Sequence, residues 1–293
     1  MKKLFLSLLM LTSIGAMAQV SYCDVNFDNK VNTADVVAIY NKIISGDEPT
    51  KPQMEELTFE INYQGAPLGL VMRPVEGGTF MMGRTGEQTS YSGTAHLVTL
   101  SSYYMEMTEL PQAFWESVMG SNPSKHQGAF YPVEKVSWND CQTFISKLNT
   151  MLKDQLPDGM KFRLPTEAEW EFAARGGIKS MHYLYSGSND IDEVACYGDS
   201  WGETQFTLAL KKGNELGLYD MSGNVWEWCQ DWYGSYSSQA QTNPTGPKSG
   251  SSRICRGGSF DHAASDCTVA FRTDQAPTYT DYALGFRLVL AHE

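Results

Sequence analysis

Apolar and polar side chains alternate along residues 57–63, where Leu57, Phe59, Ile61 and Tyr63 fall on one side. A period of two is typical of a strand that buries one face. Further runs of this kind occupy residues 70–75, 78–83, 95–100 and 103–107. The pattern therefore predicts a sheet of short strands that begins at residue 57.

Two segments carry the helical period together with start and stop signals. Residues 111–119 have a proline in the first turn and are followed by Gly120, as is common for helices. Residues 138–153 have one apolar face and follow Ser137, with Asp140 three positions later. A serine N-cap accepts hydrogen bonds from backbone donors that the first turn leaves unpaired, so we predict a helix in each segment.

A third helix is predicted over residues 166–175. Thr166 and Glu169 form a capping box after a proline, and two glycines follow the last turn. Glu167, Glu169 and Glu171 all lie on this short helix. We interpret these carboxylates as capping and surface charge, and an acid–base pair stays open until their geometry is known.

After residue 177 the chain is rich in Gly, Ser, Asn, Asp and aromatic residues for more than a hundred positions. Strand-like pieces are short and lie at residues 254–260, 269–272 and 285–290. Long loops with many large aromatic side chains are expected to pack on themselves. Short strands, three helices and this loop-rich second half indicate an α+β domain over residues 57–293.

Residues 1–18 have the features of a secretory signal peptide. Lys2 and Lys3 precede an apolar run that ends at Ala-Met-Ala, the order expected of such a signal. The run is too short to span a bilayer, and no later segment approaches the roughly 20 apolar residues that a span needs. We therefore expect an exported chain without a membrane span, in the periplasm, at the cell surface or outside the cell.

A calcium-loop pattern follows within residues 19–46. Oxygen-bearing side chains occupy positions 1, 3, 5, 9 and 12 of a twelve-residue loop, and a carbonyl is available at position 7. The expected ligands are Asp24, Asn26, Asp28, Lys30 (through its carbonyl), Asn32 and Asp35. The loop and the short apolar helix after it resemble one repeat of a type I dockerin, which implies calcium and a cohesin-like partner. Such modules normally carry two repeats; a solvated acidic turn is the alternative. Residues 47–56, charged and with a proline, are interpreted as a linker.

Composition narrows the classes of function. The 293 residues are 42% hydrophobic with a net charge of −12, which fits one sizeable domain with a small appendage. Nucleic acid is excluded as a partner, because phosphate binding needs clustered lysine and arginine. The six cysteines are either paired structural residues, as an exported chain permits, or buried free thiols.

Seven phrases follow one another in order along the main segment. They are EGGTFMMG (76–83), GSNPS (120–124), PVEKVSW (132–138), FRLPTEAEWE (162–171), LGLYDMSGNVWEW (216–228), RGGSF (256–260) and GFR (285–287). Together they resemble the formylglycine-generating enzyme family, also called the sulfatase-modifying factor domain. The resemblance implies the fold of that family, a loop-rich variant of the C-type lectin fold.

The resemblance also implies a calcium site. It maps onto the side chains of Asp220 and Glu227 and the carbonyls of Gly223 and Val225. Carboxylates and backbone oxygens in an irregular turn suit a hard cation that takes about 6–8 oxygen ligands. The alternative is that Glu227 caps or pairs locally.

Oxidase members of the family hold copper between two cysteines, and this chain departs from that pattern. The second cysteine matches Cys267, whereas His262 occupies the position of the first. One thiolate cannot supply a two-sulfur copper site, although imidazole also binds copper. Cys267 and His262 are therefore the candidate catalytic pair; the alternatives are a structural cysteine and an exposed loop histidine. Trp226 and Ser259 match residues of the family's substrate groove, or serve packing and a turn.

Another branch of this fold uses its last loops to bind ligands, including variable proteins diversified by retroelements. The mix of Tyr, Ser, Asp and Thr in the corresponding loops here is typical of an adaptable binding surface. The candidate positions are Asp261, His262, Ser265, Asp266, Thr278, Tyr279, Thr280, Asp281 and Tyr282.

We therefore expect an exported, calcium-binding protein that acts as a binding or accessory partner of extracellular proteins or glycans. The first alternative is an oxidase that converts a sulfatase cysteine to formylglycine, which requires Cys267 to suffice without the first cysteine. The second is a ligand-binding protein with diversified C-terminal loops. The chain has no His-Glu-x-x-His sequence and no phosphate-binding loop that would point to other chemistry.

Overall fold

The computed structural model describes residues 54–83, 94–198 and 207–292. The chain divides between Met54 and Glu55 into two units, and the elements below belong to the second. The predicted signal peptide (1–18), the calcium-loop repeat (19–46) and most of the linker (47–56) lie outside the described residues.

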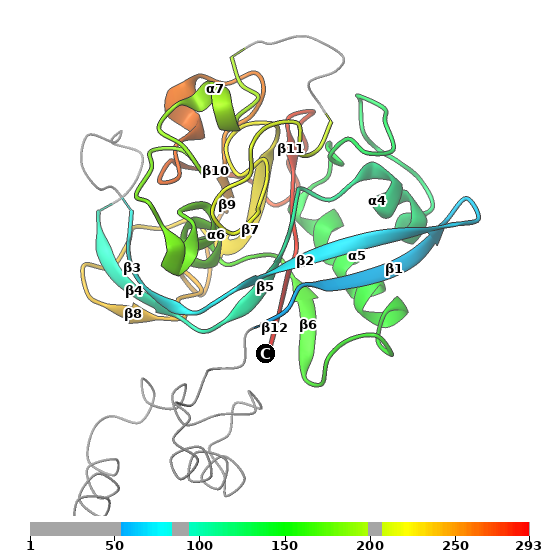
Figure 1. Cartoon of the computed structure of the whole chain (residues 1–293), viewed down its shortest axis with the longest axis horizontal. Helices are drawn as coiled ribbons and strands as arrows, with labels where there is room; N and C mark the ends of the chain where they lie inside the picture. Colours follow the sequence, from blue (N-terminus) through cyan, green and yellow to red (C-terminus); the bar gives the residue numbers. More distant parts are fainter. Residues whose placement is uncertain (1–53, 84–93, 199–206, 293) are drawn as a thin grey trace, which may run out of the picture. The chain divides into compact units, whose positions relative to one another are not determined.

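The largest sheet has five strands, and each strand is antiparallel to its neighbours. Its first strand alternates exposed and buried residues, as the sequence predicts. The strand closest to the C-terminus pairs in the interior of the sheet, between β5 and β6 (Figure 1). In spatial order the strands are β1 (Leu57–Tyr63), β2 (Ala66–Val75), β5 (Tyr103–Glu106), β12 (Val289–His292) and β6 (Met160–Arg163).

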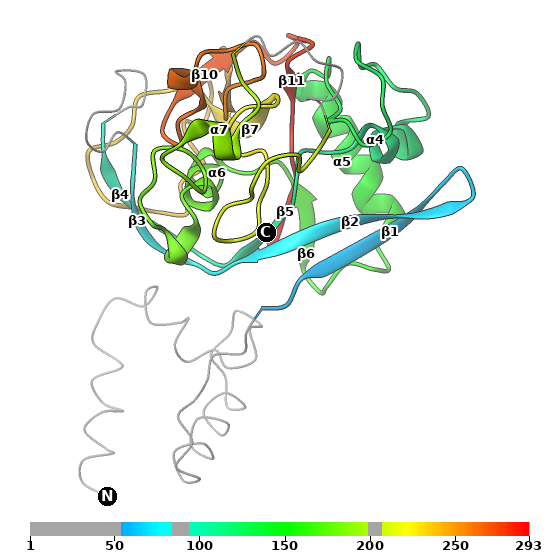
Figure 2. The same cartoon turned by 45° about the horizontal axis from the view of Figure 1, so that its top comes forward.

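Two smaller sheets complete the strand layers (Figure 2). The second contains β10 (Arg272–Gln275), β9 (Arg253–Arg256), β7 (Trp226–Trp232) and β11 (Leu284–Gly285), with β11 parallel to β7. The third contains β3 (Gly78–Met82), β4 (His96–Leu100) and β8 (Gln241–Thr242), with β8 parallel to β4.

Strand β7 corrects the prediction that the chain after residue 177 has no strand before residue 254. It pairs with β9 on one side and β11 on the other, and its residues 226–229 are buried without interruption. A strand covered on both faces does not alternate, so the period of two is missing. The predicted strands at 269–272 and 285–290 are displaced: the first lies at β10, and the second divides into β11 and β12.

The three predicted helices are confirmed as α4 (Gln112–Met119), α5 (Trp138–Met151) and α6 (Glu167–Ala174). Both capping boxes are present, at Ser137 and Thr166. The remaining turns are short: α7 (Ile191–Val194), η2 (Gly177–Lys179) and η3 (Ala264–Cys267). Within the described ranges no helix has both the length and the apolar character needed to cross a membrane.

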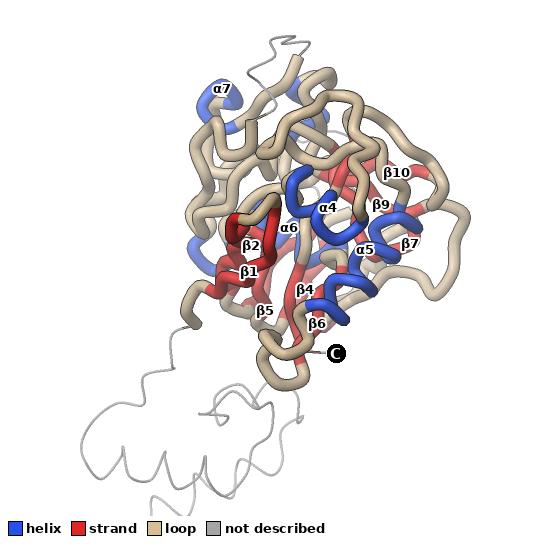
Figure 3. Tube along the Cα trace, turned by 90° about the vertical axis from the view of Figure 1, so that its right-hand side faces the viewer, coloured by secondary structure: helices blue, strands red, loops and turns tan. Residues whose placement is uncertain are grey.

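Two apolar cores hold these layers together. The first lies between the β1–β2 hairpin and helices α4 and α5, where Trp115 stacks on Phe144 with ring centroids 5.1 Å apart. Both helices are on the side of the domain that faces the viewer in Figure 3. The second core surrounds α6, which contacts β3, β4, β7 and β9 and buries Trp170 and Phe172. These strands and helices confirm the α+β class.

The carboxylates of α6 are not surface charges, and that interpretation is wrong. Glu167, Glu169 and Glu171 are only 3%, 8% and 0% exposed. They are buried because α6 is packed on several sides, and each is paired with arginine: Glu167 with Arg272, Glu169 with Arg163, and Glu171 with Arg175 and Arg256. The capping part of the prediction is confirmed for Glu169. Since these groups are held in ion pairs inside the domain, they do not form an acid–base pair.

Candidate ligand-binding site

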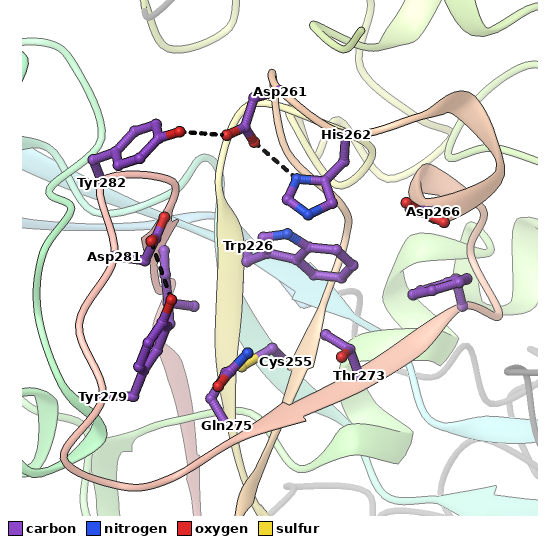
Figure 4. A pocket seen from close by; sticks show the side chains of 12 residues that line it. Trp226, Cys255, Asp261, His262, Asp266, Thr273, Gln275, Tyr279, Asp281 and Tyr282 are labelled. Carbon is purple, nitrogen blue, oxygen red and sulfur yellow. Dashed lines mark hydrogen bonds and ion pairs between the residues drawn. The ribbon is translucent and has the colours of Figure 1, made fainter. Parts of the chain in front are cut away.

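A pocket of about 270 Å³ opens between the second sheet and the two last loops (Figure 4). The sheet contributes Trp226, Cys255, Thr273, Gln275 and Leu284, with Phe271 just before β10. The loops contribute Asp261, His262, Asp266, Tyr279, Asp281 and Tyr282. Six of the nine candidate loop positions therefore line the pocket; the other three are Ser265, Thr278 and Thr280.

The register of the second sheet explains how its side chains reach the pocket. Thr273 lies opposite Cys255, and Cys255 lies opposite Trp228. Because residues two apart share one face of a strand, Gln275 joins Thr273, and Trp226 joins Trp228, on this face. Arg256 and Arg272, each next to one of these residues along its strand, point to the other face, where they pair with the carboxylates of α6.

Asp261 connects the two loops. Its Oδ1 accepts a hydrogen bond from Ser259 Oγ at 2.6 Å and lies 2.8 Å from His262 Nδ1, while its Oδ2 accepts one from the Tyr282 hydroxyl at 2.9 Å. Burial raises the pKa of Asp261, but these hydrogen bonds outweigh it and hold the pKa below its usual value. The group is therefore an anion at neutral pH.

Two further carboxylates and several rings complete the lining. Asp281 accepts hydrogen bonds from the Ala283 backbone N–H at 2.9 Å and from the Tyr279 hydroxyl at 3.2 Å. Asp266 accepts one from Ser265 at 3.1 Å. The His262 ring stands edge-on to Trp226, with centroids 5.3 Å apart.

The structure separates the residues of the predicted substrate groove and catalytic pair. Trp226 and His262 line the pocket, whereas Ser259 and Cys267 do not. Ser259 is fully buried and is hydrogen-bonded to Asp261 and His262. Ser259 therefore positions pocket side chains, while Trp226 is placed to touch a ligand directly.

Cys267 lies in a small apolar cluster with Tyr185 and Val194 and is 0% exposed. Burial, assisted by the nearby Asp266 carboxylate, raises the pKa of its thiol to about 12. A thiol must ionise to become a nucleophile or a metal ligand, and this environment opposes ionisation.

The cysteines of the described ranges are buried free thiols, so they form no disulfides. They are Cys141, Cys196, Cys229, Cys255 and Cys267. Of the two alternatives that the sequence leaves open, the buried free thiol holds for these five. Cys23 lies outside the described residues.

These residues do not fit the copper centre of the oxidases. The only matching cysteine has an environment that favours the neutral thiol, and the Nδ1 of His262 is engaged by Ser259 and Asp261. In the part of the chain that the structure describes, no three His, Cys, Asp or Glu side chains converge as metal ligands. We therefore derive no reaction step through copper.

The loop predicted to bind calcium fits that ion only in part. Both oxygens of Glu227 are taken by Arg287 at 2.7 Å, and Oε2 also accepts from Trp170. Asp220 accepts one hydrogen bond, from Ala209 N–H, and the amide oxygen of Asn224 is buried without a partner. The carboxylate of Asp220 and the nearby backbone and amide oxygens thus suit a metal cation. The carboxylate of Glu227 is already neutralised by the guanidinium of Arg287.

A further carboxylate that the sequence did not single out lies beside this loop. Glu109 accepts hydrogen bonds from Val225 N–H at 3.1 Å and from the Asn224 amide at 2.9 Å. Burial, together with repulsion from Asp220 and Glu227, raises its pKa well above the usual range. The carboxyl groups of Glu109, Asp220 and Glu227 thus surround the guanidinium of Arg287, and the raised pKa favours the neutral form of Glu109.

Several lining residues were missed from the sequence, among them Cys255, Phe271, Thr273 and Gln275. Thr273 and Gln275 carried no strand signal, because residues 272–275 are all polar, and the predicted strand ended at residue 272, where β10 begins. Nothing local marks Cys255 as a pocket residue, because its position depends on pairing with β7 and β10.

Comparison with family models matches residues 69–292 to the sulfatase-modifying factor enzyme 1-like domain. The chaperone protein LppX of Paenibacillus barcinonensis is 35% identical over 241 residues, which cover 67% of this chain and 81% of that protein. The formylglycine-generating enzyme of Thermomonospora curvata is 32% identical over 201 residues, which cover 61% of each chain.

Among solved structures, the Treponema denticola variable protein 1 superposes with a TM-score of 0.72 at 31% identity. The match covers 81% of this chain and 99% of that one. The likeness confirms the predicted loop-rich, C-type-lectin-like fold of the formylglycine-generating type.

Proposed function

Because this chain belongs to the sulfatase-modifying factor enzyme 1-like domain family, we propose that it is an exported ligand-binding member of that family and not a cysteine oxidase. One observation carries the proposal. The last two loops form a pocket from exposed and half-buried polar and aromatic side chains, while the only family-matched cysteine is buried outside it.

Family membership alone does not choose between these functions. The relatives include a protein named as a chaperone and one named as a formylglycine-generating enzyme. In the oxidase reading, Cys267 would have to ionise and reach a substrate. Its burial and the raised pKa of its thiol work against both requirements.

The ligand we propose is an extracellular protein or glycan. Export is supported by the signal-like residues 1–18, and the calcium-loop repeat at 19–46 would tether the protein to a cohesin-like partner. The likeness to a Treponema denticola protein named variable protein 1 favours diversified C-terminal loops as a second candidate. Asp261, His262 and Tyr279 to Tyr282 are the positions at which close relatives would then differ.

We also propose a calcium ion at residues 220–227, held by Asp220 and by the carbonyls of Gly223 and Val225. The unpartnered amide oxygen of Asn224 supports a cation there, because a buried oxygen without a partner is costly. Glu227 would remain with Arg287 in this arrangement. The ion would stabilise the loop that precedes Trp226, and it takes no part in a reaction.

The oxidase alternative is tested directly by activity. The purified protein is incubated with copper, O₂ and a Cys-x-Pro-x-Arg peptide, and mass spectrometry measures conversion of the cysteine to the aldehyde. We expect no aldehyde, with the Thermomonospora curvata enzyme as the positive control. Robust conversion that is lost in Cys267→Ser would falsify the binding-only proposal.

A further inference from the structure

The ionisable lining of the pocket is almost entirely acidic. Asp261, Asp266 and Asp281 line it together with a single histidine, and the lining contains no lysine or arginine. Asp261 is held ionised by its hydrogen bonds. The chain as a whole also carries a net charge of −12, which favours association with cationic partners.

The carboxylates have few oxygen positions left for a ligand's hydroxyl groups. Asp261 already takes part in three short contacts, with Ser259, His262 and Tyr282. Both oxygens of Asp281 accept hydrogen bonds from within the protein. A sugar would need free acceptors in fixed directions, whereas a cation is attracted by the net charge whatever the direction.

Aromatic rings supply the second part of the recognition. Trp226 lies in the middle of the pocket, with Asp261 and Asp281 on one side and Asp266 on the other (Figure 4). Tyr279 is 40% exposed, which leaves it accessible. Rings of this kind attract an ammonium or guanidinium group and also pack against its alkyl stem.

The protein itself shows that a cation can be held at this rim. The ammonium of Lys125 lies 4.2 Å from the centroid of the Tyr282 ring. Tyr282 is the residue whose hydroxyl donates to Asp261. One edge of the pocket therefore already holds a basic side chain over an aromatic ring.

Building on the proposed binding function, we infer that the pocket binds the lysine or arginine side chain of a basic segment in a partner protein. The cationic group lies near Asp261 and Asp281, and the alkyl stem packs against Trp226 and Tyr279. A pocket of about 270 Å³ accommodates one such side chain and not a whole peptide, so the flanking residues of the partner contact the loop surface.

The test uses N-acetyl-arginine methylamide as a probe, with N-acetyl-citrulline methylamide as its neutral counterpart of nearly the same shape. Binding is measured by saturation-transfer NMR and by titration calorimetry. A single side chain is expected to bind with a Kd of about 1 mM, and citrulline at least about tenfold more weakly. Binding should also weaken as salt screens the carboxylates.

Two variants and one control test whether the arginine derivative binds in this pocket. Asp261→Asn and Asp281→Asn each remove one charge with little change in shape and should weaken arginine binding by roughly three- to tenfold. Asp154→Asn makes the same charge change at an exposed position outside the pocket and should leave binding unchanged. Thermal melts of all three confirm that each variant is folded.

Equal binding of the citrulline and arginine derivatives would overturn the inference, as would unchanged arginine binding in both pocket variants. Methyl glycosides are titrated in parallel, and a glycoside that binds while the arginine derivative does not would assign the pocket to glycans. The probe contains no cysteine, so its result is separate from the oxidase test. If the arginine derivative does not bind and the oxidase test is also negative, the proposed binding function still holds, but for a different ligand.

Discussion

Gly258 explains how a thiol lies so close to the pocket loop and yet remains enclosed. Its φ is +76°, and a Cβ added there would lie 2.5 Å from the sulfur of Cys267 and 2.9 Å from the Cα of the same residue. The Cα of Cys267 is a backbone atom, so it cannot move away by a side-chain rotation. The second glycine of the RGGSF phrase is therefore required by the packing of Cys267.

This enclosure predicts how Cys267 reacts. At pH 8, a thiol with a pKa of about 12 is ionised in roughly one molecule in ten thousand. We expect iodoacetamide to leave Cys267 unmodified in the native protein and to alkylate it after denaturation, as measured by peptide mass spectrometry. Ser265→Cys, at an exposed position in the same short turn, is the matched control and should react readily. Rapid native alkylation of Cys267 would contradict its burial.

Helix α6 shows how buried charge organises the domain. Arg256 of β9 and Arg272 of β10 come from the face of the sheet opposite the pocket and pair with the carboxylates of α6. Removing one member of a buried ion pair leaves an uncompensated charge, which typically costs about 3–5 kcal/mol. One face of the second sheet therefore forms the floor of the pocket, and the other face carries these ion pairs. The ion pairs hold the sheet, and with it the pocket floor, in position.

Asp231 gives α6 a pH-dependent contribution to stability. It accepts a hydrogen bond from Glu167 N–H at the start of the helix, and burial with the nearby Glu167 raises its pKa to about 8. An unfolded aspartate titrates near about 3.9. The folded state thus holds the proton more tightly, so the group favours folding at low pH and its contribution is lost as pH rises from about 4 to 8.

Asp231→Asn should remove this loss, because an amide stays neutral and its oxygen can still accept from Glu167. Relative to the wild type, the variant should gain about 2 kcal/mol or more in unfolding free energy between pH 4 and pH 8. Denaturant melts at several pH values measure it, with the exposed Asp154→Asn as control. A constant difference across this range would show that Asp231 is ionised throughout.

The helices could be predicted because their signals are local. Ser137 with Asp140 and Thr166 with Glu169 form capping boxes within single turns of chain. Strand β7 could not, because its burial on both faces comes from strands and a helix distant in sequence. The charges of α6 were misjudged for the same reason, since their arginine partners lie up to 105 residues away.

The pocket was predicted in part. The family resemblance pointed to the last two loops, and six of the nine positions named from it do line the pocket. The floor was missed because Cys255, Thr273 and Gln275 are brought together only by the antiparallel register of β9 and β10. The sequence suggested that Cys267 and His262 act as a pair. The structure buries Cys267 against Gly258, whereas His262 lines the pocket.

Arg287 joins parts of the domain that are far apart in sequence. Its guanidinium pairs with Glu227 of β7 and donates to the backbone carbonyls of Glu106 at 3.2 Å and Tyr219 at 2.9 Å. It thereby connects the first sheet, the second sheet and the loop proposed to hold calcium. A cation bound at Asp220 should for this reason stabilise the whole domain.

We expect calcium to raise the melting temperature and EGTA to lower it. Calcium at a hundred times its Kd adds about 2.7 kcal/mol of stability. Asp220→Ala should abolish the difference in thermal melts. Asp24→Ala, which removes a predicted ligand of the separate N-terminal loop, should preserve it. A melt that EGTA does not change, in the wild type as in Asp220→Ala, would argue against calcium at residues 220–227.

The interior position of β12 has a consequence for the order in which the protein can be made. Residues 289–292 bridge β5 and β6, and a nascent chain that ends at β11 lacks that bridge. The main sheet therefore closes only after the ribosome has added these residues, although its first strands were synthesised more than two hundred residues earlier. Pairing over such separations is slow, so we expect the main sheet to form only after these last strands have been synthesised.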